Sequence, residues 1–385
     1  MEFSATFEQM PDDMVSSMAT PNSSPRIILA DNMLAVAATV DVAVAMDPTA
    51  GRITVDSALC GQGNDQDYVY VGNGFVDGKG PCEIGAVFDG HGKVGSFSKR
   101  HFIEFVRAAP LHDLLVQDKP INALVSYFKQ FENIYDFQTG STAVIVRLFP
   151  ETKTVEWWSV GDSTVAIYIN GILHSTNPHH SPTNCSEMSR LNELFGFWRL
   201  EENMRKPLVI SPTEITLGPG AYAHFPPKDM RRQTDYLQLA LTQSLGHHDY
   251  TGYSVDAEGE MGEHGSLVYE GCDDVKVVLC SDGATDMLVP MPRLHSSDQD
   301  HYRIPDWLFM AAELSTATVI MEETVRRWGQ EWIYVLKGYK PCSHQFSTQR
   351  GDRDDVGVVT MFVKGDPSIK SKFFCAAEPW DRRWV

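Results

Sequence analysis

Apolar runs that end abruptly in an aspartate beside a glycine recur along this chain. The clearest run, Ile84 to Phe88, leads directly into Asp89-Gly90-His91-Gly92. A short apolar run closed by a turn signal predicts a buried strand, so we expect Asp89 at a sheet edge. Gly90 permits a tight turn, and His91 can exchange a proton near neutral pH. Taken alone, this stretch is better explained as an ordinary solvated turn.

The same combination of strand edge and acid appears elsewhere. Four edges carry an acid, and two more acids stand in similar places: Asp67, Asp89, Asp282 and Asp354, then Asp162 and Asp286. A hairpin turn is a good alternative interpretation of Asp162. Carboxylates a few ångströms apart repel and raise one another's pKa, so a fold that gathers five or six of them needs cations. Six charges match two or three divalent ions, and oxygen ligands favour Mg²⁺ or Mn²⁺ over Zn²⁺.

Such a centre suits reactions at phosphorus. Two ions about 3.5–4 Å apart would hold a bridging water, lower its pKa and polarise a phosphoryl group. In-line displacement then needs no protein nucleophile. In agreement with this, the chain contains no Gly-x-Ser-x-Gly elbow and no Walker loop. His247-His248-Asp249 could suggest another metal site, but consecutive residues rarely converge on one ion.

Composition narrows the classes of partner. The net charge of −19 argues against nonspecific binding to nucleic acid or to an anionic membrane. Seven cysteines at irregular spacing, without a Cys-x-x-Cys pair, favour free thiols in a reducing compartment. No basic segment precedes an apolar one near the start, so we expect no secretory signal and an intracellular protein, cytoplasmic or nuclear. A monomer is the default.

By length, the 385 residues could form two or three domains or equally one large sandwich. We expect a flexible tail over 1–26, one domain over 27–364 and a second tail over 365–385. Periodicity predicts helices over about 97–115, 121–131, 236–245, 307–314 and 318–335. The two tryptophans of the last helix, Trp328 and Trp332, are expected in the core.

Six short motifs together resemble the PP2C family, the metal-dependent protein serine/threonine phosphatases. They occur in the family's order between about residues 55 and 364: Val87-Phe88-Asp89-Gly90-His91-Gly92, Gly140-Ser141-Thr142-Ala143, Gly161-Asp162-Ser163, Ser244-Leu245-Gly246, Ser281-Asp282-Gly283 with Asp286, and Arg353-Asp354-Asp355. Any one is weak, whereas six in order are strong. The resemblance implies an α+β fold, an αββα sandwich of two antiparallel sheets flanked by helices, with metals at one end.

The resemblance also implies roles for the acids. Asp89 would bridge two ions, with the Gly90 carbonyl on one of them, and Asp282 and Asp354 would hold the other. A weaker third ion would lie at Asp162 and Asp286. His91 matches the general acid that protonates the leaving serine or threonine oxygen.

Two departures from the family pattern concern the loop before Asp67. Gln62 stands where the family often has an arginine that grips the substrate phosphate, so Gln62 is our candidate for that contact. The family's Glu-Asp pair reads Gln66-Asp67, and Lys93 could supply a replacement cation. The segments 196–235 and 290–350 match the family poorly.

Two functions therefore stay open. One is an active phosphatase on phosphoproteins. The other is a catalytically weak relative that binds partners as a scaffold, which Gln62 and Gln66 suggest.

Overall fold

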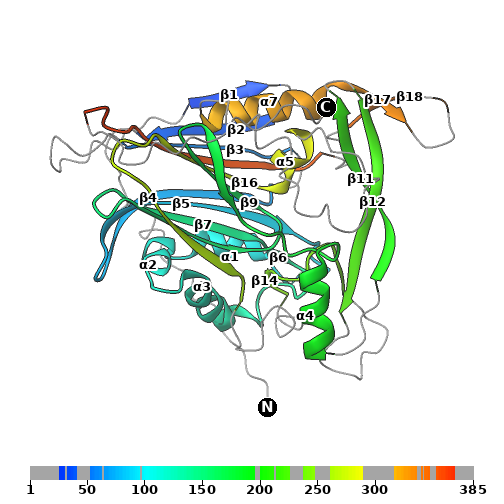
Figure 1. Cartoon of the computed structure of the whole chain (residues 1–385). Coiled ribbons are helices and arrows are strands. Elements are labelled where there is room, and N and C mark those ends of the chain that lie inside the picture. Colours follow the sequence, from blue (N-terminus) through cyan, green and yellow to red (C-terminus); the bar gives the residue numbers. More distant parts are fainter. Residues whose placement is uncertain are drawn as a thin grey trace, which may run out of the picture.

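Two antiparallel sheets stack face to face, and helices cover their outer faces (Figure 1). The computed structural model describes residues 26–30, 33–40, 53–62, 65–95, 98–195, 200–211, 214–225, 237–247, 261–288, 316–335, 340, 342–346 and 353–368. The predicted αββα sandwich is confirmed. The helix predicted over 307–314, nearly all of the N-terminal tail and most of the C-terminal tail lie outside the described residues.

The first sheet has seven strands. Their spatial order is β1 (Arg26–Ala30), β2 (Met33–Val40), β3 (Ile53–Cys60), β19 (Val356–Val363), β16 (Val275–Cys280), β9 (Thr164–Ile169) and β10 (Ile172–Thr176). Helix α7 (Ala317–Gly329) and the short helix α5 (Asp282–Leu288) pack on its outer face. Its central strands β19, β16 and β9 bury nearly all of their side chains, as strands covered on both faces do.

The second sheet also has seven strands. Six follow the order β14 (Leu245–Gly246), β6 (Gly140–Ser141), β5 (Gly80–His91), β7 (Ala143–Phe149), β8 (Thr154–Val160) and β15 (Glu263–Val268), and β4 (Asp67–Val76) pairs with β5. Its outer face carries α1 (Phe102–Ala108), α2 (Leu111–Leu115), α3 (Pro120–Phe128) and the 3₁₀ turn Lys129–Phe131.

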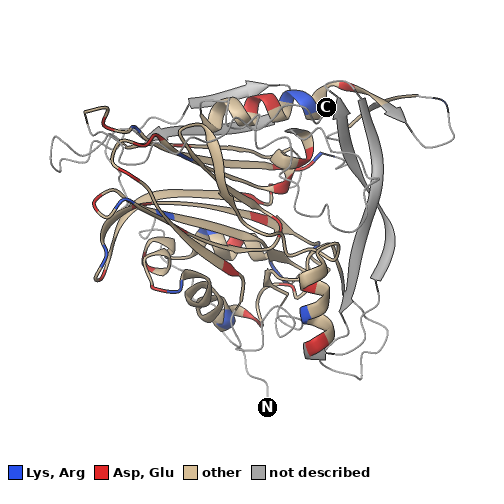
Figure 2. Ribbon diagram, in the orientation of Figure 1, with Lys and Arg blue, Asp and Glu red and all other residues tan. Residues whose placement is uncertain are grey.

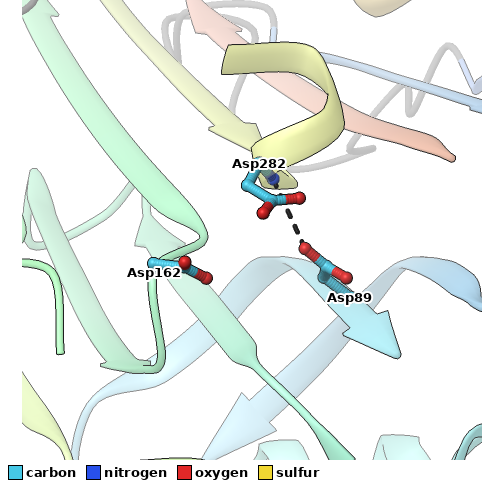
Figure 3. Close-up of side chains that lie close together, drawn as sticks. All are labelled: Asp89, Asp162 and Asp282. Carbon is cyan, nitrogen blue, oxygen red and sulfur yellow. Dashed lines mark hydrogen bonds between the residues drawn. The ribbon is translucent and has the colours of Figure 1, made fainter. Parts of the chain in front are cut away.

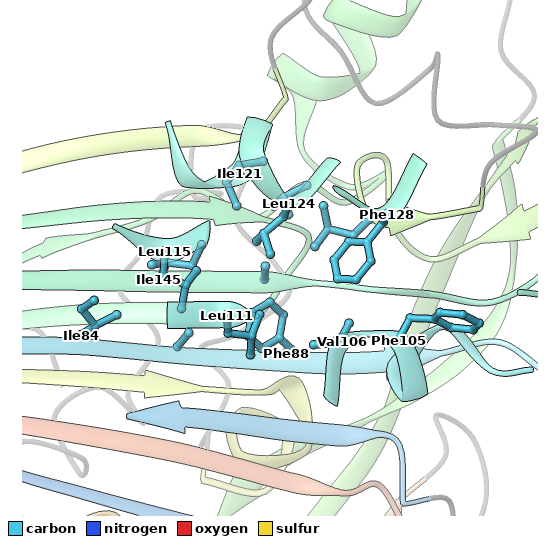
Figure 4. Packing of buried hydrophobic residues seen from close by; sticks show 14 of the residues in the cluster. Ile84, Phe88, Phe105, Val106, Leu111, Leu115, Ile121, Leu124, Phe128 and Ile145 are labelled. Atoms are coloured by element: carbon cyan, nitrogen blue, oxygen red, sulfur yellow. The ribbon is translucent and has the colours of Figure 1, made fainter. Parts of the chain in front are cut away.

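Alternation along β5 builds two cores at once. Ile84 and Phe88 point outward into the cluster under α1, α2 and α3, shown in Figure 4. Val87, one residue away, points inward and packs with Leu279 of β16 and Val359 of β19 between the sheets. Successive side chains of a strand face opposite ways, so one apolar run holds both layers together. These cores fix the strand ends that carry the acids.

The segments 196–235 and 290–350, which we expected to match the family poorly, both contribute strands to a third, smaller sheet. The hairpin β11 (Leu200–Ser211) and β12 (Glu214–Phe225) pairs with β13 (Leu237–Leu239) and, in parallel, with β17 (Glu331–Val335). β18 (Cys342–Gln345) completes this sheet. It stands at the end of the sandwich where α5 and α4 (Cys185–Phe195) lie (Figure 1).

Some helix predictions are wrong. The segment expected to be helical over 236–245 contains β13 and β14, and α7 ends at Gly329, so Trp332 lies in β17. The helix expected over 97–115 is two helices, with Pro110 at the N-cap of the second. The two tryptophans of the 318–335 segment are nevertheless buried, as predicted. Among the described residues, no helix is long and apolar enough to span a bilayer.

Candidate metal centre

The first pair of acids comes from a strand pairing. Asp67 begins β4, Asp89 lies near the end of β5, and the two residues are direct partners in the antiparallel register. Directly opposite residues of such a pair project from the same face, so both carboxyl groups lie side by side. Both residues are buried, with exposures of 2% and 6%. The fold thus places two acids together where bulk solvent hardly reaches them.

Two further acids approach Asp89 from the other sheet and from a turn. β16 leads into α5, and the backbone N–H of Asp282 at its start donates to Asp89 Oδ2 over 3.4 Å. Asp162 lies in the turn between β8 and β9. One carboxylate oxygen from each of Asp89, Asp162 and Asp282 lies within 4.8 Å of the others, and the three side chains point toward one another in Figure 3. Asp162 therefore lies in a hairpin turn and also beside Asp89 and Asp282, and its role as a metal ligand stays a prediction.

Asp354 belongs to the same electrostatic cluster. Burial raises its pKa well above the usual range, and the charges of Asp282 and Asp67 raise the pKa further. The pKa of Asp89 is raised first by burial and then by Asp282, Asp67 and Asp354. The charge of Asp286 also raises the pKa of Asp354. Figure 2 shows acidic segments of both sheets at the end next to α5.

The surroundings of the Asp67 carboxylate indicate whether these clustered acids suit a bound cation. Burial, followed by the charge of Asp355, raises the pKa of Asp67 well above its ordinary value. Its Oδ2 atom is buried and has no hydrogen-bond partner among the described residues. A buried carboxylate oxygen left unpaired is costly, and a bound cation would remove that cost. A set of oxygen donors of this kind is consistent with a metal site.

Asp355 has a role that sequence reasoning missed. It is 1% exposed, and its two carboxylate oxygens accept the backbone N–H groups of Gln62 at 2.5 Å and Gln66 at 2.6 Å. This carboxylate therefore holds the loop that leads into Asp67. A signal was available, because neighbouring residues of an extended segment point to opposite sides, so Asp354 and Asp355 should not both face the cluster of acids.

At position 283 the backbone of a neighbouring segment lies so close that only glycine fits. A Cβ built on Gly283 would lie 1.9 Å from the carbonyl oxygen of Asp355. Only glycine lets the start of α5 come this close to the segment of Asp354 and Asp355. The glycine therefore serves the assembly of Asp282 with Asp354.

The structure places Gln62 and Gln66 in the wall of the site. Gln62 is 1% exposed, and its Nε2 donates to the Asp354 carbonyl over 2.8 Å. Gln66 Nε2 donates to the Gly92 carbonyl over a long 3.4 Å, and the Gln66 carbonyl accepts the N–H of Gly90. In this arrangement the Gln62 amide faces the protein, whereas the predicted phosphate contact requires it to face the substrate.

His91 stands beside the acids and contacts a second histidine. Its Nδ1 lies 3.4 Å from the Asp89 carbonyl, and its Nε2 lies 2.8 Å from Nε2 of His247. Burial lowers the pKa of His91 to about 4, while the Asp89 carbonyl opposes that shift. Sequence reasoning considered His247 only as a metal ligand. The useful signal was its position directly after the motif Ser244-Leu245-Gly246.

The family assignment agrees with this geometry. The family model described as "Protein phosphatase 2C" matches residues 70–291, which is more than half of the chain. The chain belongs to the protein phosphatase 2C family. No curated protein matches it.

Solved structures give remote similarities. A sex determining protein of C. elegans is 19% identical with a TM-score of 0.45, over 82% of this chain and 65% of that chain. A serine-threonine phosphatase 2C from Toxoplasma gondii is 16% identical with a TM-score of 0.43, over 89% and 99%. A serine/threonine phosphatase of S. agalactiae is 14% identical with a TM-score of 0.40, over 81% and 99%. This chain thus spans less than two thirds of the C. elegans chain.

Proposed function

We propose that the protein is a Mg²⁺- or Mn²⁺-dependent phosphatase that hydrolyses phosphoserine and phosphothreonine in proteins. The observation that carries this proposal is the convergence of Asp89, Asp162 and Asp282 within 4.8 Å, in a chain of the protein phosphatase 2C family. Bound ions would supply a water of lowered pKa and positive charge for the phosphoryl oxygens.

Each acid has a proposed place in that centre. Asp67 and Asp89, with the carbonyl of Gly90, would hold one ion, and Asp89, Asp282 and Asp354 would hold a second. A third ion would use the two remaining acids, Asp162 and Asp286. The unpaired buried oxygen of Asp67 supports its part in this assignment. The raised pKa values of Asp67, Asp89 and Asp354, caused first by burial, support a shared cation site.

His91 is proposed to donate a proton to the leaving serine or threonine oxygen. Its Nδ1 lies 3.4 Å from the Asp89 carbonyl, which places the ring next to the acids, and the residue is partly exposed to solvent. Alkoxides are poor leaving groups, so a proton donor at this point lowers the barrier most for alkyl phosphates. A His91→Ala variant should therefore slow phosphothreonine hydrolysis more than hydrolysis of p-nitrophenyl phosphate. Equal slowing of both would contradict the role.

The test is metal-dependent release of phosphate from a phosphothreonine peptide. Turnover should require Mn²⁺ or Mg²⁺ and should fall about a hundredfold or more in Asp89→Asn and Asp282→Asn, because each removes charge that the transition state needs. Asp77→Asn is the matched control, since it changes an exposed acid in the hairpin turn at the other end of β4 and β5. It should retain the wild-type rate.

A second candidate is a catalytically weak scaffold. It is favoured by Gln62 and Gln66, which are neutral and whose side-chain amides donate to backbone carbonyls. A folded protein that binds Mn²⁺ but releases no phosphate at any metal concentration would favour this candidate over the enzyme.

A further inference from the structure

Thr142 forms two hydrogen bonds with one of the clustered acids, Asp89. It lies between the short strand β6 and strand β7, and it is 1% exposed. Its backbone N–H donates to the Asp89 carbonyl over 2.8 Å, and the backbone N–H of Asp89 donates to Thr142 Oγ1 over 3.2 Å. One of these two bonds therefore depends on the threonine side chain.

The same side chain contacts the turn that carries Asp162. Thr142 Oγ1 lies 2.6 Å from Ser163 Oγ, so one hydroxyl donates to the other, and Ser163 is itself 1% exposed. Gly161 precedes Asp162 with a φ of +96°, and a Cβ built there would lie 2.5 Å from the Cγ2 methyl of Thr142. Thr142 therefore touches both chain neighbours of Asp162 while its hydroxyl accepts from Asp89.

A later segment of the chain supports the shape of this turn. Asn177 Nδ2 donates to the Ser163 carbonyl over 3.0 Å, and the backbone N–H of His180 donates to the Gly161 carbonyl over 2.9 Å. These bonds shape the turn, whereas the hydroxyl of Thr142 links the turn to the acid on β5. Two of the sequence motifs, 140–143 and 161–163, are joined in this way.

We infer that Thr142 is a positioning residue that holds Asp162 at the metal centre beside Asp89 and thereby sets the affinity for the ion that Asp162 ligates. The inference rests on the proposed function, because that function assigns both acids to the centre. Divalent ions need oxygen ligands at about 2.0–2.6 Å, so a small displacement of the turn would take Asp162 out of reach. Residues that orient metal ligands typically contribute about 10–100-fold to metal affinity.

Three substitutions separate the hydroxyl bridge from the packing around it. Thr142→Val keeps the branched shape and removes the hydroxyl, whereas Thr142→Ser keeps the hydroxyl and removes the methyl group. Ser163→Ala removes the other half of the bridge and leaves the bond between Thr142 and Asp89 in place.

The matched control is Thr360→Val. Thr360 is a buried residue of β19 whose Oγ1 also accepts a backbone N–H over 3.2 Å, that of Ala317 at the start of α7. Loss of this hydroxyl should lower stability without changing metal affinity, because it leaves a buried donor unpaired away from the acids.

Isothermal titration calorimetry with Mn²⁺ measures the outcome, and Asp162→Asn identifies the binding step that depends on Asp162. Thr142→Val and Ser163→Ala should each weaken that step about tenfold. The double variant should lose about as much as either single variant, because both remove the same bond. Thr142→Ser and Thr360→Val should stay within about threefold of the wild type, since both keep the bridge.

Urea unfolding first establishes that each variant is folded under the conditions of the titration. An unchanged Asp162-dependent step in folded Thr142→Val would overturn the inference. Equal weakening in Thr142→Val and Thr360→Val, or a wild type in which no Mn²⁺ binding step depends on Asp162, would also overturn it. A wild type that binds Mn²⁺ as expected but releases no phosphate would instead defeat the proposed function, and the affinities would still decide the role of Thr142.

Discussion

Asp67 and Asp89 face each other across β4 and β5, and both carboxyl groups are buried. Two buried acids in direct register oppose folding unless a proton or a cation lies between them, because each loses hydration and repels the other. The β4–β5 hairpin therefore builds a site that is unfavourable by itself and favourable with an ion. This coupling of metal to stability can be measured without any substrate.

Removing a buried polar group usually destabilises a protein, but Asp67→Asn should stabilise the metal-free form. In EDTA the variant should be more stable than the wild type by about 1–2 kcal/mol, since one buried charge and its repulsion disappear. With excess Mn²⁺ the wild type should gain stability by ligand linkage, about 2.7 kcal/mol at a hundred times the Kd, whereas the variant should gain little. Urea unfolding under both conditions measures this. Asp77→Asn should behave as wild type in each.

Asp355→Asn should loosen the loop before Asp67. An asparagine offers one oxygen to the two N–H groups of Gln62 and Gln66, so one buried donor loses its partner, at a cost of about 1–3 kcal/mol. Because that loop places Asp67, the affinity for Mn²⁺ should also fall, by about tenfold. Isothermal titration calorimetry measures the affinity.

The comparison variant for Asp355 is Asp65→Asn, which changes an exposed acid of the same loop that pairs with Arg107. An exposed pair contributes little, so its Mn²⁺ affinity should stay within about threefold of the wild type. Equal losses in the two variants would contradict the anchoring role of Asp355.

Glu83 should make stability depend on pH away from the metal centre. It lies in β5 with an exposure of 4%, and burial raises its pKa from 4.5 to about 7. The folded state therefore holds a proton that the unfolded state has released, so stability falls as the pH rises from about 4.5 through 7. Glu83→Gln should match the wild type near pH 4.5 and exceed it by about 1–3 kcal/mol at pH 8. Urea unfolding with the exposed Glu151→Gln as control tests this, and equal stability at pH 8 would contradict it.

The acids of the centre could be predicted because each stands beside a local signal. Asp89 and Asp282 follow apolar runs, and Asp354 precedes one, so each strand end is visible in a window of a few residues. Their convergence followed from charge, since acids gathered at strand ends require cations. The family resemblance added the order of the motifs and the sandwich.

The features that sequence reasoning missed depend on pairing over long separations. The segment before His247 has a helical pattern, but Leu245 and Gly246 pair with β6, more than a hundred residues earlier. Tertiary pairing overrides local propensity there. The anchoring role of Asp355 likewise involves Gln62 and Gln66, which lie close only after β19 has paired with β3.

The central claim is that Asp67, Asp89, Asp282 and Asp354 together hold divalent ions. Anomalous diffraction at the manganese edge from crystals containing Mn²⁺ tests this most directly. We expect at least two anomalous peaks within coordination distance of these carboxylates, both of them contacted by Asp89, and loss of these peaks in Asp89→Asn. Ordered carboxylates with no manganese between them, or manganese bound only elsewhere, would contradict the account.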